Sequence, residues 1–306
     1  MGRRWARMGS LVMTGVMFTG ILAGGGSAAV AASQVPLCFG KKATIVGTSH
    51  GDVLQGTPRN DVMAGLGGND VIRGAEGDDV ICGGLGADVI RGGEDVEGNQ
   101  LRGGPGPDRI SSGGGDFYDY GGGQIIRGDG GADKLTGTTG HDYVYGGGGN
   151  DVILGMGTND PYFPEKLFGG AGNDEIRGGP YGSSHEPPEF PTEVLYGGPG
   201  EDLLAEGQMV DYSDATEAVT VDLAAGTATG QGHDKLVAIG SVAGSSFDDT
   251  LTGNDEANHL LGLGGNDRLA GAGGDDVLVG GPGTDSLDGG LDQDACDGET
   301  EVNCEQ

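Results

Sequence analysis

Aliphatic residues recur singly, nine positions apart, along most of the chain, and each stands two places after an acidic residue. In residues 67–93, which read GGNDVIRGAEGDDVICGGLGADVIRGG, the acids are Asp70, Asp79 and Asp88, and an isoleucine follows each one. Because successive side chains of a strand point to opposite faces, each aliphatic triplet predicts a short strand with one inward side chain. The glycines predict tight turns between these strands, since glycine adopts positive φ angles at little cost.

The unit Gly-x-x-Gly-x-Asp-x-aliphatic-x runs without a gap from Gly47 to Arg91 and returns, with insertions, toward the end of the chain. Fifteen units keep the aspartate and the aliphatic residue together, and low complexity alone does not hold such a register. The predicted fold is all-β, a parallel β-roll or β-helix solenoid of nine-residue rungs. The candidate metal ligands are the aspartates of these units: Asp52, Asp61, Asp70, Asp79, Asp88, Asp108, Asp133, Asp142, Asp151, Asp174, Asp202, Asp249, Asp267, Asp276 and Asp285.

This unit resembles the repeat of the RTX (hemolysin-type) calcium-binding proteins, whose nonapeptide G-G-x-G-x-D-x-U-x builds a parallel β-roll. The likeness covers residues 43–298 and implies calcium ions bound in the turns, an extracellular location and folding on calcium. The chemistry of the residues agrees, since aspartate carboxylates and turn carbonyls are hard oxygen ligands suited to Ca²⁺. We therefore expect several calcium ions, with each rung completing a neighbouring rung's site.

Two rungs complete one coil in this architecture, so alternate rungs stack on the same edge. Counted from Gly47, the odd rungs of the first block all keep the aspartate, and insertions near 94–98, 112–123, 156–164 and 180–192 all precede even rungs. The even positions are Asp61, Asp79, Asn99, Gln124, Asp142, Glu165 and Glu193. The sequence therefore predicts an unbroken calcium ladder along one edge and loops along the other.

The inserted loops are rich in aromatic residues. Loops gathered on one face of a solenoid often form its binding surface, so a glycan or cell-surface ligand is one hypothesis for them. The alternative is tolerated drift at an edge that no longer needs calcium, with aromatic rings covering the roll. The residues concerned are Phe117, Tyr118, Tyr120, Tyr162, Phe163, Tyr181 and Phe190.

The charge of the chain indicates a cationic partner. Its formal net charge is −31 at pH 7, and phosphate binding needs clustered Lys and Arg, so we expect no nucleic-acid partner. A chain this acidic is either disordered or neutralised by cations, and the regular spacing favours the second. With 70 glycines and 5% aromatic residues, the chain also lacks the large side chains of a broad core.

The N-terminus has the three parts of an export signal: a basic GRRWAR, an apolar MGSLVMTGVMFTGILAGG and a small-residue SAAVAAS. We expect a signal peptide at residues 1–32, an extracellular protein and no membrane span, because the apolar run is short and broken by glycines. Family members that use a dedicated one-step exporter lack such a signal. After it, the sequence predicts an N-terminal cap (33–46), a calcium-binding roll with loops (47–205), a non-repeat spacer that continues the solenoid (206–243), and a second repeat block with a C-terminal cap (244–306).

Export makes disulfides plausible for Cys38, Cys82, Cys296 and Cys304. Three pairings are possible, and the separation along the chain favours Cys38–Cys82 and Cys296–Cys304. A zinc site is the competing interpretation, although the spacing fits no zinc-ligand pattern.

No G-x-S-x-G elbow or P-loop lysine motif occurs, and no segment outside the repeats is long enough for a catalytic domain. The sequence thus predicts a secreted, non-enzymatic calcium-binding protein that serves as a structural or adhesive surface module. The alternative is an enzyme acting on extracellular polysaccharide, or its binding module, through the loop-bearing edge.

Overall fold

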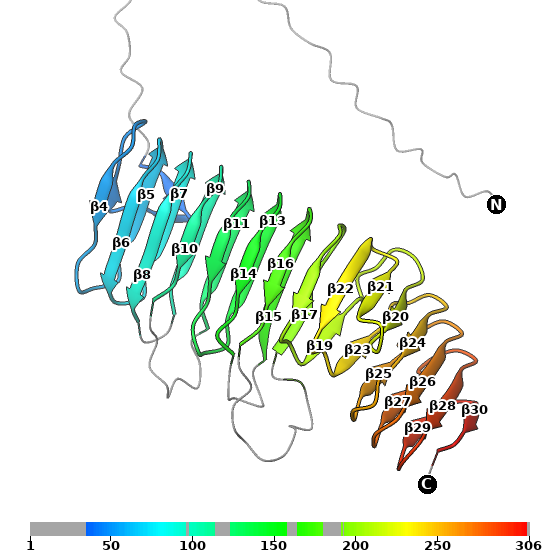
Figure 1. Cartoon of the computed structure of the whole chain (residues 1–306). Helices are drawn as coiled ribbons and strands as arrows, with labels where there is room; N and C mark the ends of the chain where they lie inside the picture. The colour runs from blue at the N-terminus through cyan, green and yellow to red at the C-terminus, as the bar shows by residue number, and fades with distance from the viewer. Residues whose placement is uncertain are drawn as a thin grey trace, which may run out of the picture. The chain divides into compact units, whose positions relative to one another are not determined.

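The computed structural model describes residues 35–95, 98–113, 123–157, 164–179, 191 and 193–304, and these residues form short strands and turns without a helix (Figure 1). From residue 35 onward the chain is one compact unit. Each aliphatic triplet of the repeat lies in a strand, and several strands continue through the glycines that follow it. The fold is all-β, as the nine-residue repeat predicts. Within these described ranges no helix is long and apolar enough to cross a membrane.

The strands form two long sheets, in which the described residues supply 15 and 13 strands. In order, the 15-stranded sheet consists of β4 (Val53–Gln55), β6 (Val71–Glu76), β8 (Val89–Glu94), β10 (Arg109–Ser111), β12 (Lys134–Thr136), β14 (Val152–Leu154), β16 (Glu175–Arg177), β18 (Leu203–Ala205), β22 (His233–Val237), β21 (Thr227–Thr229), β20 (Thr220–Asp222), β24 (Thr250–Thr252), β26 (Arg268–Ala272), β28 (Ser286–Gly290) and β30 (Thr300–Val302). The 13-stranded sheet consists of β3 (Ile45–Val46), β5 (Val62–Gly67), β7 (Val80–Leu85), β9 (Gln100–Pro105), β11 (Ile125–Gly130), β13 (Tyr143–Gly148), β15 (Glu165–Ala171), β17 (Glu193–Tyr196), β19 (Met209–Asp211), β23 (Ser241–Ala243), β25 (His259–Leu261), β27 (Val277–Val279) and β29 (Ala295–Asp297).

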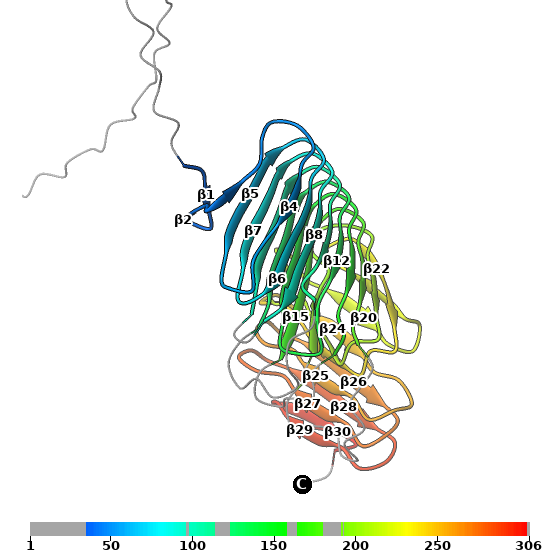
Figure 2. The same cartoon turned by 90° about the vertical axis from the view of Figure 1, so that its left-hand side faces the viewer.

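Alternate rungs belong to alternate sheets. In the 15-stranded sheet Ile72 of β6 pairs with Ile90 of β8 in parallel register, and in the 13-stranded sheet Met63 of β5 pairs with Ile81 of β7. Figure 2, in which the N-terminal coils face the viewer, shows the strands of successive coils lying one behind another. The odd and even rungs therefore stack on separate edges, and this confirms the two-rung coil predicted from the sequence.

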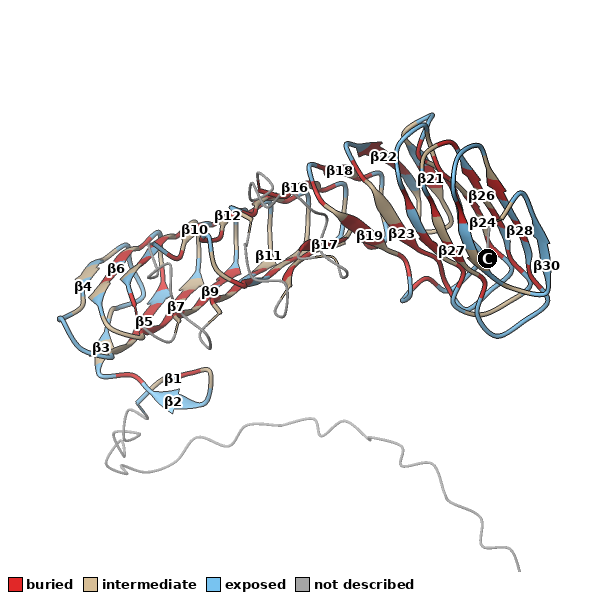
Figure 3. Cartoon of the chain, turned by 90° about the horizontal axis from the view of Figure 1, so that it is seen from below, coloured by how far each residue is buried: buried red, intermediate tan, exposed pale blue. Residues whose placement is uncertain are grey.

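Two rows of aliphatic side chains, one from each sheet, fill the space between the sheets. Ile72, Ile81, Ile90 and Leu101, from four successive rungs, are completely buried. The buried positions recur as red segments along both rows of strands in Figure 3. Because each rung contributes one large inward side chain, the core is narrow. Within a sheet, the neighbours of each rung are the rungs one coil away.

The spacer predicted at 206–243 continues both sheets. In the 13-stranded sheet β19 pairs in parallel with β17 and β23, so that sheet runs through without interruption. In the 15-stranded sheet β22, β21 and β20 form an antiparallel meander between β18 and β24. Tyr212 from the spacer is buried in the core.

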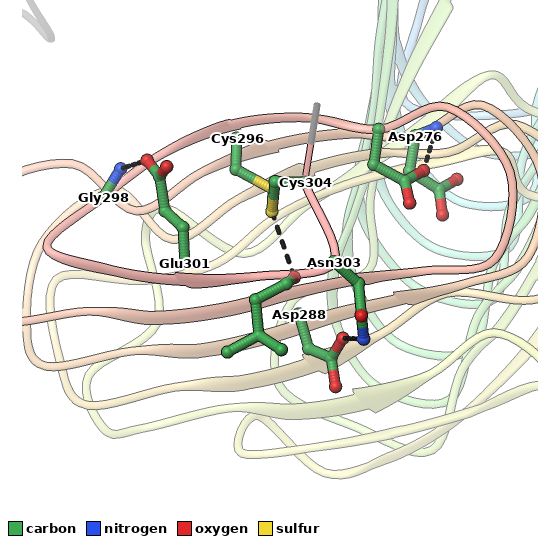
Figure 4. Close-up of a disulfide and its surroundings, with 9 residues drawn as sticks. Asp276, Asp288, Cys296, Gly298, Glu301, Asn303 and Cys304 are labelled. Carbon is green, nitrogen blue, oxygen red and sulfur yellow. Dashed lines mark hydrogen bonds between the residues drawn. A yellow bond between two sulfur atoms is a disulfide. The ribbon is translucent and has the colours of Figure 1, made fainter. Parts of the chain in front are cut away.

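Both ends of the described chain carry a disulfide, with the pairing that the sequence favours. Cys38 lies in β1 (Leu37–Cys38), which forms a small antiparallel hairpin with β2 (Lys41–Lys42), and its bond to Cys82 ties that hairpin to β7. Cys296 of β29 is bonded to Cys304 just after β30 (Figure 4). The zinc alternative therefore falls. The expected signal peptide lies outside the described residues, and the expected segment boundaries stay a prediction.

Candidate metal centres

The odd-rung aspartates form a hydrogen-bonded row along one edge. The backbone N–H of Asp52 donates to Oδ1 of Asp70 at 2.7 Å, and Asp70 donates in the same way to Asp88 at 2.8 Å. The pattern repeats from coil to coil, at 2.7–2.8 Å, until it reaches Asp202. Each carboxylate is thereby fixed in one orientation by the aspartate of the preceding coil.

The second repeat block extends both edges. Asp249 donates to Asp267 and Asp267 to Asp285, at 2.8 and 2.9 Å, just before strands β24, β26 and β28 of the 15-stranded sheet. These three aspartates therefore stand on the same edge as the odd row. Asp276 lies on the other edge, before β27, as Asp61 and Asp79 do before β5 and β7.

Most of these aspartates have one carboxylate oxygen, Oδ2, that is buried and lacks a hydrogen-bond partner among the described residues. Their side chains are at most 3% exposed. A buried ionised oxygen without a partner is costly, so the repetition of this feature indicates a missing positive charge. The eleven residues are Asp70, Asp79, Asp88, Asp108, Asp133, Asp151, Asp174, Asp202, Asp267, Asp276 and Asp285.

Backbone carbonyls face these oxygens. A Cβ atom added to Gly65 would clash with both Asp70 Oδ2 and the carbonyl oxygen of Gly83, which belongs to the next coil. Gly74 holds the same position between Asp79 Oδ2 and the carbonyl of Gly92. The carboxylate oxygen and the carbonyl oxygen thus lie close together without a hydrogen-bond donor of the described protein on the carboxylate oxygen. The glycine leaves the space between the two oxygens open.

The set of oxygen atoms that would bind a metal in these turns fits Ca²⁺. It consists of hard oxygens, which calcium prefers, and it joins a carboxylate of one coil to a carbonyl of the next. Across the described part of the chain, no three carboxylate, imidazole or thiol side chains gather into a metal-binding group. Backbone carbonyls would therefore supply most of the remaining ligands, and this suits calcium better than the softer transition metals.

The electrostatics of the row agree with a need for cations. Burial raises the pKa of Asp108 and Asp202 to about 7, and that of Asp174 to about 6. The hydrogen bond from the preceding aspartate's N–H lowers each pKa, and the neighbouring carboxylates of the row raise it again. Without a cation, the folded row thus holds carboxylates that resist ionisation near neutral pH.

The repeat, the coil and the carboxylate row coincide with a known family model. The RTX calcium-binding nonapeptide repeat matches residues 46–81, 55–90, 73–95, 125–160, 164–180, 243–278 and 271–300, which together cover more than half of the chain. This protein belongs to the RTX calcium-binding repeat family. No curated protein matches the chain significantly. Calcium binding by RTX repeats is thus a property of the family, while the individual sites in this chain are predictions.

Four of the fifteen candidate aspartates are bonded differently from the other RTX turns of this chain. Asp52, Asp61, Asp142 and Asp249 each accept hydrogen bonds from the backbone N–H and the hydroxyl of a threonine or serine four residues earlier. Their Oδ2 atoms therefore have partners within the protein.

In the middle of the even edge, side-chain amides stand in place of two aspartates and hydrogen-bond to a buried carboxylate. Asn99 and Gln124 replace the aspartate in two successive coils, and their side-chain amides donate to the carboxylate of Asp95, at 2.8 and 3.0 Å. The buried Asp95 thus receives its donors from side chains that take the place of the RTX aspartates.

Two and three coils beyond Gln124 on this edge, Glu165 and Glu193 are both buried. Burial raises the pKa of both carboxyls, and the nearby carboxylate of Glu193 raises that of Glu165 further. Burial therefore disfavours ionisation of this pair. At the degenerate positions of the even row, amides and buried glutamates thus stand where the odd row has aspartates.

Sequence reasoning missed three acids at repeat positions: Asp234, Asp294 and Glu299, whose Oε2 accepts from Asp285 N–H at 2.8 Å. Asp234 continues the odd row, because Asp202 N–H donates to its Oδ1 at 3.1 Å, while Tyr212 Oη donates to its Oδ2 at 3.0 Å. Asp294 accepts from Asp276 N–H at 2.9 Å. The segments GHDKLV and GGLDQDACD carry partial repeats that a looser pattern would find, the second with Cys296 in the aliphatic position.

The loop aromatics predicted as a binding surface, from Phe117 to Phe190, lie outside the described residues. An aromatic row is nevertheless present on the 13-stranded sheet, where Tyr145, Phe168 and Tyr196 stack in successive coils with ring centroids 4.7 and 4.4 Å apart. Arg127 extends this row, with its guanidinium 5.0 Å from the Tyr145 ring centroid. Stacking across coils adds cohesion to a narrow fold.

Proposed function

We propose that this protein is a secreted, non-enzymatic calcium-binding solenoid that folds on calcium and serves as a structural or adhesive module at the cell surface. One observation carries the proposal: eleven buried aspartates have an Oδ2 atom without a hydrogen-bond partner in the described structure. These oxygens recur coil after coil beside backbone carbonyls. A calcium ion in each such turn neutralises the carboxylate and links two coils.

Folding on calcium follows from the balance of repulsion and burial. Carboxylates of successive coils stand about 5 Å apart, the spacing of neighbouring strands. Each unneutralised pair repels by roughly 1–3 kcal/mol, depending on the effective dielectric constant. One buried aliphatic side chain per rung offsets too little of this repulsion once the conformational entropy of the glycine-rich chain is included.

Several features support secretion. The sequence begins with a basic, an apolar and a small-residue segment in the order of a signal peptide. Two disulfides tie the ends of the described chain, and such bonds persist in oxidising compartments. Calcium at about millimolar concentration outside cells matches the weaker affinity class of extracellular sites. The chain would thus meet its ligand and its oxidant on the same side of the membrane.

Two observations support a non-enzymatic role: the sequence lacks the catalytic motifs named above, and the aspartates of the repeat are buried in turns. The buried carboxylates point into turns that a metal ion would close, rather than toward an open cleft. A structural module needs only the long pair of sheets, whose outer faces and loops are available to partners.

Circular dichroism of the mature chain tests the proposal. In calcium-depleted buffer we expect a largely disordered spectrum, and addition of calcium to millimolar levels should produce the β signal cooperatively. Magnesium at the same concentration is the matched control, because it demands a smaller octahedral site and dehydrates reluctantly. An unchanged β signal in the absence of calcium would contradict calcium-dependent folding.

A further inference from the structure

The residue four positions before the aspartate differs between the two kinds of turn, and we call it the second position of the nonapeptide. In the four internally bonded turns it is Thr48, Thr57, Thr138 or Ser245. The N–H of Thr48 donates to Asp52 Oδ2 at 2.6 Å and its hydroxyl to the same atom at 2.9 Å. Thr57 makes the same two bonds to Asp61, at 2.7 and 2.9 Å.

In the eleven turns with an unpartnered Oδ2 the second position has a left-handed backbone. Six of these residues are glycines, with φ between 90° and 118°: Gly84, Gly104, Gly147, Gly170, Gly198 and Gly281. The other five are Leu66, Ala75, Asp129, Leu263 and Ala272, with φ between 73° and 96°. Neither the three threonines nor the serine is left-handed. The backbone state and the bonding of Oδ2 thus divide the fifteen turns in the same way.

The left-handed turn is unfavourable for the five residues that have a Cβ, at about 1 kcal/mol or more each. It also withholds the second-position N–H from the carboxylate, since Oδ2 has no partner there. Without a cation, the five turns whose second residue has a Cβ are unfavourable on both counts, and the six glycine turns are unfavourable on the second. The threonine and serine turns avoid both costs, because donors of the protein occupy the oxygen that a cation would need: the N–H and the hydroxyl in the threonine turns, and the N–H alone in the serine turn, whose hydroxyl donates to Oδ1.

We propose that the second position decides which aspartate turns take calcium, and that threonine or serine there produces a metal-free turn. This inference rests on the proposed calcium function and restricts it to eleven of the fifteen candidate aspartates. Asp52, Asp61, Asp142 and Asp249 belong to turns that close without an ion. The aspartate alone therefore does not identify a calcium site in this repeat.

Three of the four metal-free turns stand at the start of a repeat block, and the fourth, at Asp142, lies within the first block. Asp52 and Asp61 belong to the first two rungs, and Asp249 belongs to the first full repeat after the spacer. In a solenoid each coil is stabilised chiefly by its neighbours. Turns that close without calcium at the start of each block would give the calcium-dependent coils a surface on which to assemble.

Crystals of the full mature chain grown in calcium, with anomalous diffraction collected at long wavelength, test the proposal site by site. We expect calcium peaks beside the aspartates whose second position is left-handed, and none beside Asp52, Asp61, Asp142 or Asp249. A calcium peak beside Asp61 or Asp249 would overturn the inference.

Two substitutions at one turn test the cause. Ala75→Thr places the hydroxyl residue four positions before Asp79, and we expect the calcium peak at that turn to disappear. Ala75→Gly is the matched control, since glycine keeps the left-handed backbone, and it should retain the peak. Conversely, Thr57→Gly should create a peak beside Asp61. An undiminished peak beside Asp79 in Ala75→Thr would overturn the inference.

The outcomes separate this inference from the proposed function. No calcium anywhere in the wild-type chain would overturn the proposed function itself. Calcium in all fifteen aspartate turns would leave that function intact and overturn only the rule for the second position. If Ala75→Thr does not fold, the positions of calcium in the wild-type crystals still decide between these results.

Discussion

The backbone N–H of Asp88 donates a 2.7 Å hydrogen bond to Oδ1 of Asp108, in the next coil, while Oδ2 of Asp108 is buried without a partner in the described structure. One carboxylate thus has two roles. Its first oxygen fixes the register between coils, and its second oxygen is left for a cation. In a row of such residues, the hydrogen bonds that hold neighbouring coils together therefore depend on carboxylates whose charge must be neutralised.

Removing one carboxylate from the odd row should weaken calcium-driven folding. Asp151→Asn keeps an Oδ1 acceptor for Asp133 N–H but removes the negative charge. We expect the calcium midpoint, measured by circular dichroism, to rise on the order of tenfold, because calcium affinity follows the ligand charge. The effect should reach neighbouring coils, since each stabilises the next.

The matched control lies on the even edge. Glu193→Gln has the same size as the original residue and replaces a carboxyl whose pKa burial raises. We expect its calcium midpoint to stay within about twofold of the wild type, because burial disfavours ionisation of the Glu193 carboxyl and the uncharged amide is a close replacement for it. Equal shifts for both variants would show that the two edges do not differ in calcium binding.

The narrow core should be sensitive to truncation of one of its aliphatic side chains. Ile90 is completely buried between Ile72 and Ile110 of the adjacent coils. Ile90→Ala in the calcium-loaded protein should lower the free energy of unfolding by about 2–4 kcal/mol, through lost burial and a residual cavity. Thermal denaturation in excess calcium measures this loss.

Val89→Ala is the control for this position, because Val89 precedes Ile90 in the same strand but points to the partly exposed face. We expect a loss below about 1 kcal/mol, since only part of that side chain is buried. A similar loss for both variants would mean that the inward row does not carry the core.

Much of this arrangement follows from the sequence because each nonapeptide repeats the same physical constraints. The inward aliphatic residue, the acid two places before it and the glycine turn are local, so the coil and the two edges were predictable. The disulfide pairings followed instead from the separation of the cysteines along the chain. Asp234 was missed, because its segment GHDKLV carries only part of the nonapeptide and lies in the antiparallel β20–β22 meander of the spacer.

The internal replacements on the even edge were also beyond the sequence pattern. Asp95 lies beside an insertion, and its bonds to Asn99 and Gln124 join side chains of two coils. Thr57 and Ala75 occupy the same place in the repeat, so the pattern alone does not distinguish them. Only the backbone angles of each turn show that Ala75 is left-handed and Thr57 is not. Local patterns thus predict the scaffold, while the bonding of individual acids depends on contacts between coils.

The ion-free chain should fold better at acidic pH. Burial raises the pKa of Asp108 and Asp202 to about 7 and that of Asp79, Asp133 and Asp174 to about 6, above the ordinary value of 3.8. A carboxyl with a raised pKa in the folded state stabilises that state below its unfolded pKa, and this contribution is lost as pH rises through the folded pKa. The ion-free fold should therefore lose stability between about pH 4 and pH 7.

Circular dichroism in calcium-depleted buffer checks this sign. We expect the β signal to increase as the pH falls from 8 to about 5, while the calcium concentration needed for folding at pH 5 should exceed that at pH 7, because protons compete for the same carboxylates. A β signal that declines steadily on acidification without calcium would contradict the raised pKa values.

The turn at Asp234 offers the last test, because a tyrosine rather than a cation satisfies its carboxylate. Tyr212 Oη donates to Asp234 Oδ2 at 3.0 Å, and both residues are buried. Tyr212→Phe keeps the ring in the core but leaves that oxygen without its donor, so the free energy of unfolding in calcium should fall by about 1–3 kcal/mol. Because burial already raises the pKa of Asp234 and the tyrosine hydrogen bond lowers it, the substitution should also make this loss larger at pH 8 than at pH 5. Tyr212→Phe with Asp234→Asn is the matched double variant: the neutral amide removes the buried charge and should restore part of the stability. A double variant less stable than Tyr212→Phe alone would show that the unpaired charge of Asp234 does not cause the loss.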